Sequence, residues 1–319
     1  MIVRWGLDAL PGLLTELGVE RPLLVASPRW SPPVEVAGVW SEVPSDRIAD
    51  AAAQAQDADG LLALGGGSAI DLTKAISAET GLPMVSVPTT YSGAEWTSSF
   101  GIRSNDKRRR GSGSGAHLAG IVYEPELTLG LPRAETVGTS LNALAHTAEA
   151  LYVKGRNAEG DREALAGAPL IVVWLPRVVE DGGDLEARRR LFEGAMHAGA
   201  ALAAAGLGLG HAMAQALGGR YGLPHGALNA ITLPAALRFN EPVAGAEIAR
   251  FGEAIGADAP IGRVEGLARL GGFERLRDLG VPEDELDEVA EATAARGGAE
   301  ANPRPATPAE IAELLRSVW

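Results

Sequence analysis

Three of the five histidines in this 319-residue chain lie in segments whose sequence suggests chemistry. Asn142 and His146 are four residues apart, so both lie on one face of a predicted helix. His211 follows a glycine-rich stretch at the start of a helical pattern, and His225 lies in the turn that opens the next helix. An imidazole can bind a metal, transfer a proton or form a hydrogen bond within a core. Considered singly, each histidine is better explained as structural, so residue type alone leaves the three uses open.

Three glycines and a serine, Gly65 to Ser68, stand between a buried apolar run and a helical pattern. Glycine lets the backbone approach a ligand closely, and the first turn of a helix presents free N–H groups and a positive dipole end to an anion. Asp71 lies in that first turn. An ordinary strand-to-helix turn rarely needs three glycines, so the segment predicts a phosphate-binding turn. It is not the G-x-G-x-x-G pattern, and the analogy with the common dinucleotide-binding domain is therefore imperfect.

The apolar run Pro22 to Ala26 ends without the acidic residue that often holds the ribose 2′-hydroxyl of NAD. Ser27 and Arg29 follow it instead, and they could tolerate or attract a 2′-phosphate. The sequence therefore leaves both NADH and NADPH open as cofactors.

Short apolar runs alternate with helical patterns in the first part of the chain, which predicts a parallel sheet covered by helices. The predicted strands are 22–26, 60–64, 84–88 and, more weakly, 121–123. The predicted helices are 7–17, 48–56 and one that ends at residue 80. The basic, glycine-rich segment 108–115 is interpreted as a loop.

After about residue 132 the pattern becomes helical, with no further convincing strand. The predicted helices there are 139–153, 163–173, 185–205, 209–218 and 227–239, with a last short helix after a proline-rich connector. The sequence thus predicts an α/β dinucleotide-binding domain at 1–135 and an all-helical substrate or catalytic domain at 136–319.

Composition excludes several classes of protein. The net charge of −13 argues against a nucleic-acid surface, because phosphate binding needs a positive field. The chain has no cysteine, which excludes disulfides, thiolate nucleophiles and cysteine-bound zinc. No apolar run approaches the roughly 20 residues of a membrane span, and no leader pattern opens the chain. We expect a cytoplasmic protein with neither nucleic acid nor membrane as a partner.

Four motifs in this order resemble the iron-containing alcohol dehydrogenase superfamily: Gly65 to Ser68, Pro88 to Glu95, Asn142 to Tyr152, and Gly208 to Asn229. The match runs over most of residues 60–240. The Pro-Thr-Thr-Tyr-Ser-Gly and Leu-Asn-Ala-Leu-Ala-His forms are most similar to the maleylacetate reductase branch. The resemblance implies the dehydroquinate synthase-like architecture, with an α/β N-terminal and an all-α C-terminal domain, and a homodimer.

The resemblance also implies roles for individual residues. NADH or NADPH would be bound by Gly66, Gly67, Ser68, Asp71, Thr89, Thr90 and Ser92, with Ser27 and Lys107 as further candidates. The catalytic residues would be Asn142, His146, His211 and His225. One further histidine of the family pattern corresponds to Gln215.

In the metal-dependent members an aspartate and three histidines hold iron or zinc, and the matching aspartate position is Asn142. A neutral amide oxygen is a weaker ligand for a dication than a carboxylate, and it leaves the site without an anionic ligand. We therefore expect no metal; if one is bound, His146, His211 and His225 would hold it.

The expected activity is the NADH- or NADPH-dependent reduction of the C=C bond of maleylacetate, or of a related enone, to 3-oxoadipate in aromatic-compound degradation. One of the three histidines would supply the proton, and Asn142 would hold a substrate oxygen. Candidates for a cation that pairs with this small anionic substrate are Lys154, Arg220 and Lys107. Three alternatives stay open: a metal-dependent alcohol or polyol dehydrogenase, a sugar-phosphate cyclase of the dehydroquinate synthase type, which is a lyase, and a non-catalytic cofactor-binding protein.

Overall fold

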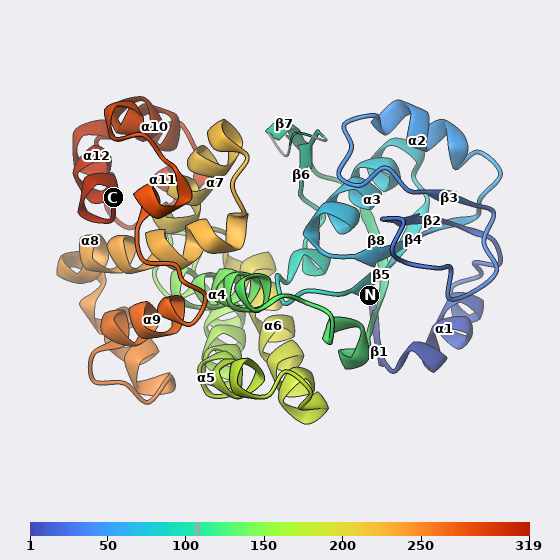
Figure 1. The fold of residues 1–319 in the computed structure, drawn as a ribbon, viewed down its shortest axis with the longest axis horizontal. Helices are drawn as coiled ribbons and strands as arrows, with labels where there is room; N and C mark the ends of the chain where they lie inside the picture. Colours follow the sequence, from blue (N-terminus) through green and yellow to red (C-terminus); the bar gives the residue numbers. More distant parts are fainter. Residues whose placement is uncertain (105, 107–108) are drawn as a thin grey trace. The chain divides into compact units, whose positions relative to one another are not determined.

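The computed structural model describes residues 1–104, 106 and 109–319 (Figure 1). The chain divides into two compact units, one of residues 1–90 and 94–130, the other of residues 91–93 and 131–319. The division after Gly130 falls shortly before the boundary predicted after residue 135. The segment 91–93 belongs to the second unit, although the residues on both its sides belong to the first.

The first unit contains a six-stranded parallel sheet. In spatial order its strands are β1 (Ile2–Trp5), β8 (His117–Tyr123), β5 (Pro83–Pro88), β4 (Gly60–Gly65), β2 (Pro22–Ala26) and β3 (Gly38–Trp40). The four interior strands contain the four predicted runs. The edge strands β1 and β3 are not predicted, because they have four and three residues and no continuous buried face.

Both faces of this sheet are covered, since every residue of β2 and β4 is buried. Successive side chains of a strand point to opposite faces. Leu23 and Leu61 therefore join one core, and Leu24 and Leu62 the other. The surrounding helices are α1 (Leu10–Glu16), α2 (Ile48–Gln54) and α3 (Gly67–Thr80), with 3-10 turns η1 (Leu7–Ala9), η2 (Ala94–Trp96) and η3 (Pro125–Thr128).

The loop interpretation of 108–115 is wrong in part, because β7 (Arg109–Gly113) pairs antiparallel with β6 (Phe100–Arg103). A Cβ atom at Gly113 would lie 2.6 Å from the Cζ atom of Phe100, so the glycine leaves room for the aromatic ring. A strand rich in glycine and arginine lacks the apolar alternation that reveals a strand in a sequence.

The second unit is entirely helical in the part that the structure describes, which confirms the predicted fold class. Its helices are α4 (Arg133–Ala150), α5 (Ala158–Glu180), α6 (Leu185–Ala205), α7 (Leu209–Tyr221), α8 (His225–Ala254), α9 (Pro260–Arg269), α10 (Leu286–Ala294), α11 (Gly297–Glu300) and α12 (Pro308–Ser317), with 3-10 turns η4 (Leu276–Leu279) and η5 (Glu283–Glu285). Among the described residues no single helix is long and apolar enough to cross a membrane; only the pair α6 and α7, bent by 100°, passes when both are combined.

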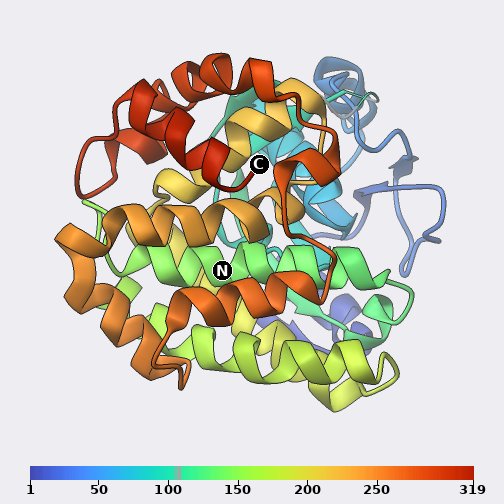
Figure 2. The ribbon, with the colours of Figure 1, turned by 60° about the vertical axis from the view of Figure 1, so that its left-hand side comes forward.

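Helix α4 is the central helix of this unit and packs against α5, α6 and α8 (Figure 2). From Thr136 to Ala150 almost every one of its residues is buried. Small residues allow the close packing: a Cβ atom at Gly138 would lie 3.2 Å from the backbone nitrogen of Ala227 in α8. Polar side chains on α4 are consequently held in a fixed, largely dry environment.

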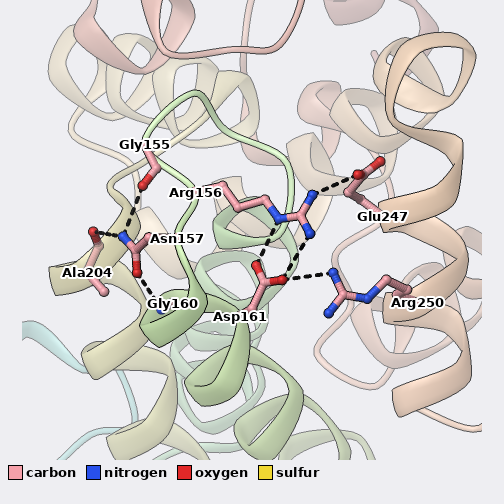
Figure 3. Close-up of polar contacts among 8 residues, drawn as sticks. All are labelled: Gly155, Arg156, Asn157, Gly160, Asp161, Ala204, Glu247 and Arg250. Carbon is pink, nitrogen blue, oxygen red and sulfur yellow. Dashed lines mark hydrogen bonds and ion pairs between the residues drawn. The ribbon is translucent and has the colours of Figure 1, made fainter.

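An ion-pair network fixes the connection between α4 and α5 (Figure 3). Arg156 donates two hydrogen bonds of 3.0 Å to the carboxylate of Asp161 and one of 2.8 Å to Glu247 of α8. Arg250 of α8 donates a further bond of 2.8 Å to Asp161. Burial alone would raise the pKa of Asp161, but the two guanidinium groups outweigh it and lower that pKa. The network therefore ties the start of α5 to α8.

Glu95 in η2 is a buried carboxyl group of the first unit, and no cation among the described residues lies at hydrogen-bond distance from it. Tyr123 donates a hydrogen bond of 2.7 Å to its Oε1 atom, and Trp96 donates one of 2.8 Å to the Tyr123 hydroxyl. The Oε2 atom is buried without a partner among the described residues. Burial raises the pKa of Glu95 above its ordinary 4.5.

We predict that Glu95→Gln changes how stability depends on pH. Above pH 4.5 the unfolded chain releases the Glu95 proton while the folded chain keeps it. This proton should therefore make the free energy of unfolding fall with rising pH, by at most about 1.4 kcal/mol per pH unit, until the raised pKa is passed. Urea unfolding of both proteins between pH 4 and 8 tests this. Parallel pH profiles for wild type and variant would contradict it.

Candidate active site

The predicted phosphate-binding turn, Gly65 to Ser68, called the phosphate turn below, is formed where β4 and β5 end side by side, with Gly65 paired to Pro88. Helix α3 begins at Gly67, and its N-cap Gly66 leaves the helix start without a side-chain cap. A Cβ atom at Gly66 would lie 2.8 Å from the methyl carbon of Thr90, so only glycine fits against it. Backbone N–H groups at the start of α3 thus stay available for an anion.

Thr89 supplies a second observation in favour of a bound group. Its backbone nitrogen donates a hydrogen bond of 3.0 Å to Gly65, which fixes it beside the turn. Its Oγ1 atom is buried and has no partner among the residues that the structure describes. A buried hydroxyl without a partner is costly unless a ligand or water satisfies it. The turn and Thr89 together fit the pyrophosphate of a dinucleotide.

Asp71 lies in the same helix, but its predicted place in the first turn is wrong, because α3 begins at Gly67 and its first turn contains no acidic residue. Its carboxylate is already engaged. It forms an ion pair of 3.1 Å with the buried ammonium group of Lys74 and accepts a hydrogen bond of 3.1 Å from the backbone of Gly101. Asp71 thereby anchors β6 next to the turn. Ser27 lies at the end of β2 and is partly buried, while Lys107 lies outside the described residues.

The histidine site of the second unit is built from three helices. Helix α4 contributes Asn142 and His146, the first turn of α7 contributes His211, and His225 is the first residue of α8. The rings of His146 and His211 are stacked with centroids 4.6 Å apart, and that of His225 lies 5.8 Å from His211. The structure thus brings together the four residues that the sequence analysis selected.

Glu149, which the sequence analysis did not select, holds His211 in place. Its carboxylate lies 2.7 Å from the Nδ1 atom of His211 and is completely buried. It also accepts backbone hydrogen bonds of 2.7 Å from Gly208 and 3.2 Å from His211. Because a carboxylate only accepts, His211 carries a proton on Nδ1. Its Nε2 atom is buried and unpartnered among the described residues.

His146 has a different environment from His211. Burial lowers its pKa well below the ordinary 6.5, and the neighbouring His211 and His225 lower it further. His146 is therefore neutral at physiological pH. Its Nδ1 atom is buried without a partner in the described part of the chain.

Asn229, also missed from the sequence, connects Asn142 and His225. Its amide nitrogen lies 2.6 Å from the Oδ1 atom of Asn142 and 3.1 Å from the Nε2 atom of His225. Asn142 in turn donates a hydrogen bond of 3.0 Å to the backbone carbonyl of Ser92. The spacing of His225 and Asn229 by four residues was the available signal, since it places both on one face of α8.

Several potential metal-ligand atoms of this site are already engaged in hydrogen bonds. Among the described residues, no three histidine, aspartate or glutamate side chains converge as a metal-binding group. The oxygen of Asn142 and the Nε2 atom of His225, two potential ligand atoms, both face the amide nitrogen of Asn229. The one buried carboxylate at His211, that of Glu149, accepts three N–H groups.

Two of the three cations considered for a substrate carboxylate have protein partners, and the third, Lys107, lies outside the described residues. Arg220 forms ion pairs of 2.6 Å with Glu285 and Glu288, which neutralise its charge. Lys154 donates a hydrogen bond of 2.7 Å to the backbone carbonyl of Glu300. Both cationic side chains are therefore already engaged by other groups of the protein.

Comparison with known proteins gives consistent similarities. Residues 5–119 match the iron-containing alcohol dehydrogenase family, and residues 136–319 match the C-terminal part of the Fe-containing alcohol dehydrogenase family. A maleylacetate reductase of Burkholderia cepacia is 35% identical over 99% of this chain and 95% of its own. The crystal structure of maleylacetate reductase from Agrobacterium tumefaciens is 30% identical, with a TM-score of 0.89, covering 100% of this chain and 95% of that one. An iron-containing alcohol dehydrogenase from Corynebacterium glutamicum is also 30% identical, with a TM-score of 0.91 and coverage of 100% and 94%.

We predict that Glu149→Gln lowers the free energy of unfolding by roughly 2–3 kcal/mol, because it removes a buried charge that accepts three N–H groups. Glu163→Gln is the matched control, since Glu163 also lies 2.7 Å from a histidine, His197, but in a partly exposed pair. The control should cost less than about 1 kcal/mol. Urea unfolding measures both, and equal losses would show that burial of Glu149 is not the cause.

Proposed function

We propose that this chain reduces the C=C bond of maleylacetate or a closely related enone. The chain belongs to the iron-containing alcohol dehydrogenase family and is an NAD(P)H-dependent oxidoreductase. The product of maleylacetate would be 3-oxoadipate. One observation carries the proposal: an amide, Asn142, held by hydrogen bonds on both sides, stands among the histidines. Relatives named maleylacetate reductase that are 32–35% identical over nearly the full chain support the substrate.

The phosphate turn is proposed to bind the cofactor. Backbone groups of Gly66, Gly67 and Ser68 would hold the pyrophosphate, with the Thr89 hydroxyl beside them. When bound, the reduced nicotinamide supplies a hydride. Asp71 would act indirectly, through its contacts with Lys74 and Gly101.

The histidine site is proposed to stabilise charge and deliver a proton. A hydride that reaches the β carbon of an enone leaves negative charge on the carbonyl oxygen, and a proton must then reach the α carbon. We propose His211 as the donor, acting from its doubly protonated form: Glu149 accepts from Nδ1, and Nε2, which would carry the second proton, has no partner in the described residues. His146 would be a neutral neighbour of the substrate.

We also propose that this reaction needs no metal. The charge on the developing enolate would be met by imidazole and amide N–H groups, which are strong donors in a buried site. The amide at Asn142 and the hydrogen bonds that occupy it support this.

The proposed activity is tested by mixing chelator-treated protein with maleylacetate and either NADH or NADPH. We expect oxidation of the nicotinamide, followed by its absorbance, that survives chelation. Activity restored only by iron or zinc, with an alcohol or aldehyde as substrate, would instead assign a metal-dependent alcohol dehydrogenase. Cofactor binding without turnover of any of these substrates would assign a non-catalytic protein.

We predict that Ser27→Asp favours NADH over NADPH. A carboxylate at the end of β2 would accept a hydrogen bond from a ribose 2′-hydroxyl and repel a 2′-phosphate. The KM for NADPH should rise by about tenfold or more relative to that for NADH, corresponding to roughly 1.4 kcal/mol. Ser27→Asn is the uncharged control and should leave the ratio nearly unchanged. An unaltered ratio in Ser27→Asp would place the ribose elsewhere.

A further inference from the structure

We infer that the backbone carbonyl of Ser92 sets the direction of a hydrogen-bond chain through Asn142 and Asn229, and that this chain holds His225 in the Nδ1–H tautomer. Asn142 and Asn229 are in this respect positioning residues. Only the relevance of this tautomer to catalysis rests on the proposed function. The tautomer itself is a property of the free protein.

The direction of the chain begins at a group that cannot be reversed. A peptide carbonyl only accepts hydrogen bonds, so the side-chain atom of Asn142 that lies 3.0 Å from Ser92 must be the amide nitrogen. The Oδ1 atom of Asn142 must then face Asn229. This removes the usual ambiguity between the oxygen and nitrogen of an asparagine side chain.

The next two hydrogen bonds have a fixed direction for the same reason. The Oδ1 atom of Asn142 only accepts, so Asn229 must place its nitrogen 2.6 Å away. That NH2 group has a second hydrogen, and the Nε2 atom of His225 lies 3.1 Å from the same nitrogen. Nε2 must therefore accept with its lone pair, which leaves the proton of the neutral ring on Nδ1.

Burial enforces this direction of the hydrogen bonds. Asn229 is 0% exposed and Asn142 is 5% exposed, so water has little access to replace a reversed bond. In a dry site a reversed amide would set two acceptors against each other at hydrogen-bond distance, which is costly. The chain of bonds therefore has a single favourable arrangement.

The hydrogen-bond chain from Ser92 to His225 requires an amide at position 142. An aspartate there would place a carboxylate oxygen, an acceptor, against the Ser92 carbonyl. The amide can satisfy Ser92 and Asn229 at the same time, since it donates at one end and accepts at the other.

The inference is tested by NMR of histidine side-chain nitrogens in 15N-labelled protein, recorded at about pH 8.5, where an ordinary histidine is neutral. Wild type should show the Nδ1–H form for His225. Asn229→Leu removes both links to His225 and Asn142, and the ratio of Nδ1–H to Nε2–H should fall by about tenfold. Asn142→Leu removes the acceptor that fixes the direction of Asn229 and should change the ratio in the same direction.

Thr232→Val is the matched control. Thr232 lies on the same helix and is equally buried, but its hydrogen bond of 2.9 Å goes to Gly210 and not to His225. This variant should keep the wild-type tautomer. An Nε2–H form in wild type, an unchanged ratio in both asparagine variants, or the same change in Thr232→Val would overturn the inference. Failure to reduce maleylacetate would contradict the proposed function alone, because the tautomer is read without substrate.

Discussion

A buried carboxylate, which has no lysine or arginine partner in the described part of the chain, organises the helical unit. Glu149 comes from the middle helix, α4, and accepts N–H groups from Gly208 and from both the backbone and the ring of His211. A charge in such a dry position is stable only when strong donors surround it. The start of α7 must therefore approach α4 closely. The glycines there make this possible, since a Cβ atom at Gly208 or Gly210 would lie within 3.0 Å of the carboxylate.

The remaining site residues depend on this contact between helices. Once α7 is fixed against α4, the ring of His211 stacks on that of His146 one helical turn before Glu149. Asn142 lies a further turn back on the same helix, where it meets Asn229 of α8. Positions 142, 146 and 149 thus form one inward-facing line on α4, and each contacts a different part of the unit.

Much of this arrangement could be predicted from patterns that depend on local physics. The interior strands are continuous apolar runs, and the glycine turn and the spacing of Asn142 and His146 are visible in the sequence. The role of Glu149 could not be predicted, because a glutamate in a helix ordinarily faces water and only its partners reveal its burial. Asn229 was missed because its role depends on the atoms on either side of it. The hairpin β6–β7 was missed because glycine and arginine carry little strand signal.

The segment 91–93 sets a constraint on the length of the chain. Thr90 lies against Gly66 of the phosphate turn, and Ser92, only two residues later, accepts from Asn142 in the helical unit. Tyr91 packs its ring 4.8 Å from Phe192, and a Cβ atom at Gly93 would lie 3.1 Å from the Cα atom of Gly199. Loops usually tolerate insertions and deletions. The residues of this loop are held by contacts, so an insertion or deletion would displace them. Length differences among homologous chains should therefore fall outside residues 89–93.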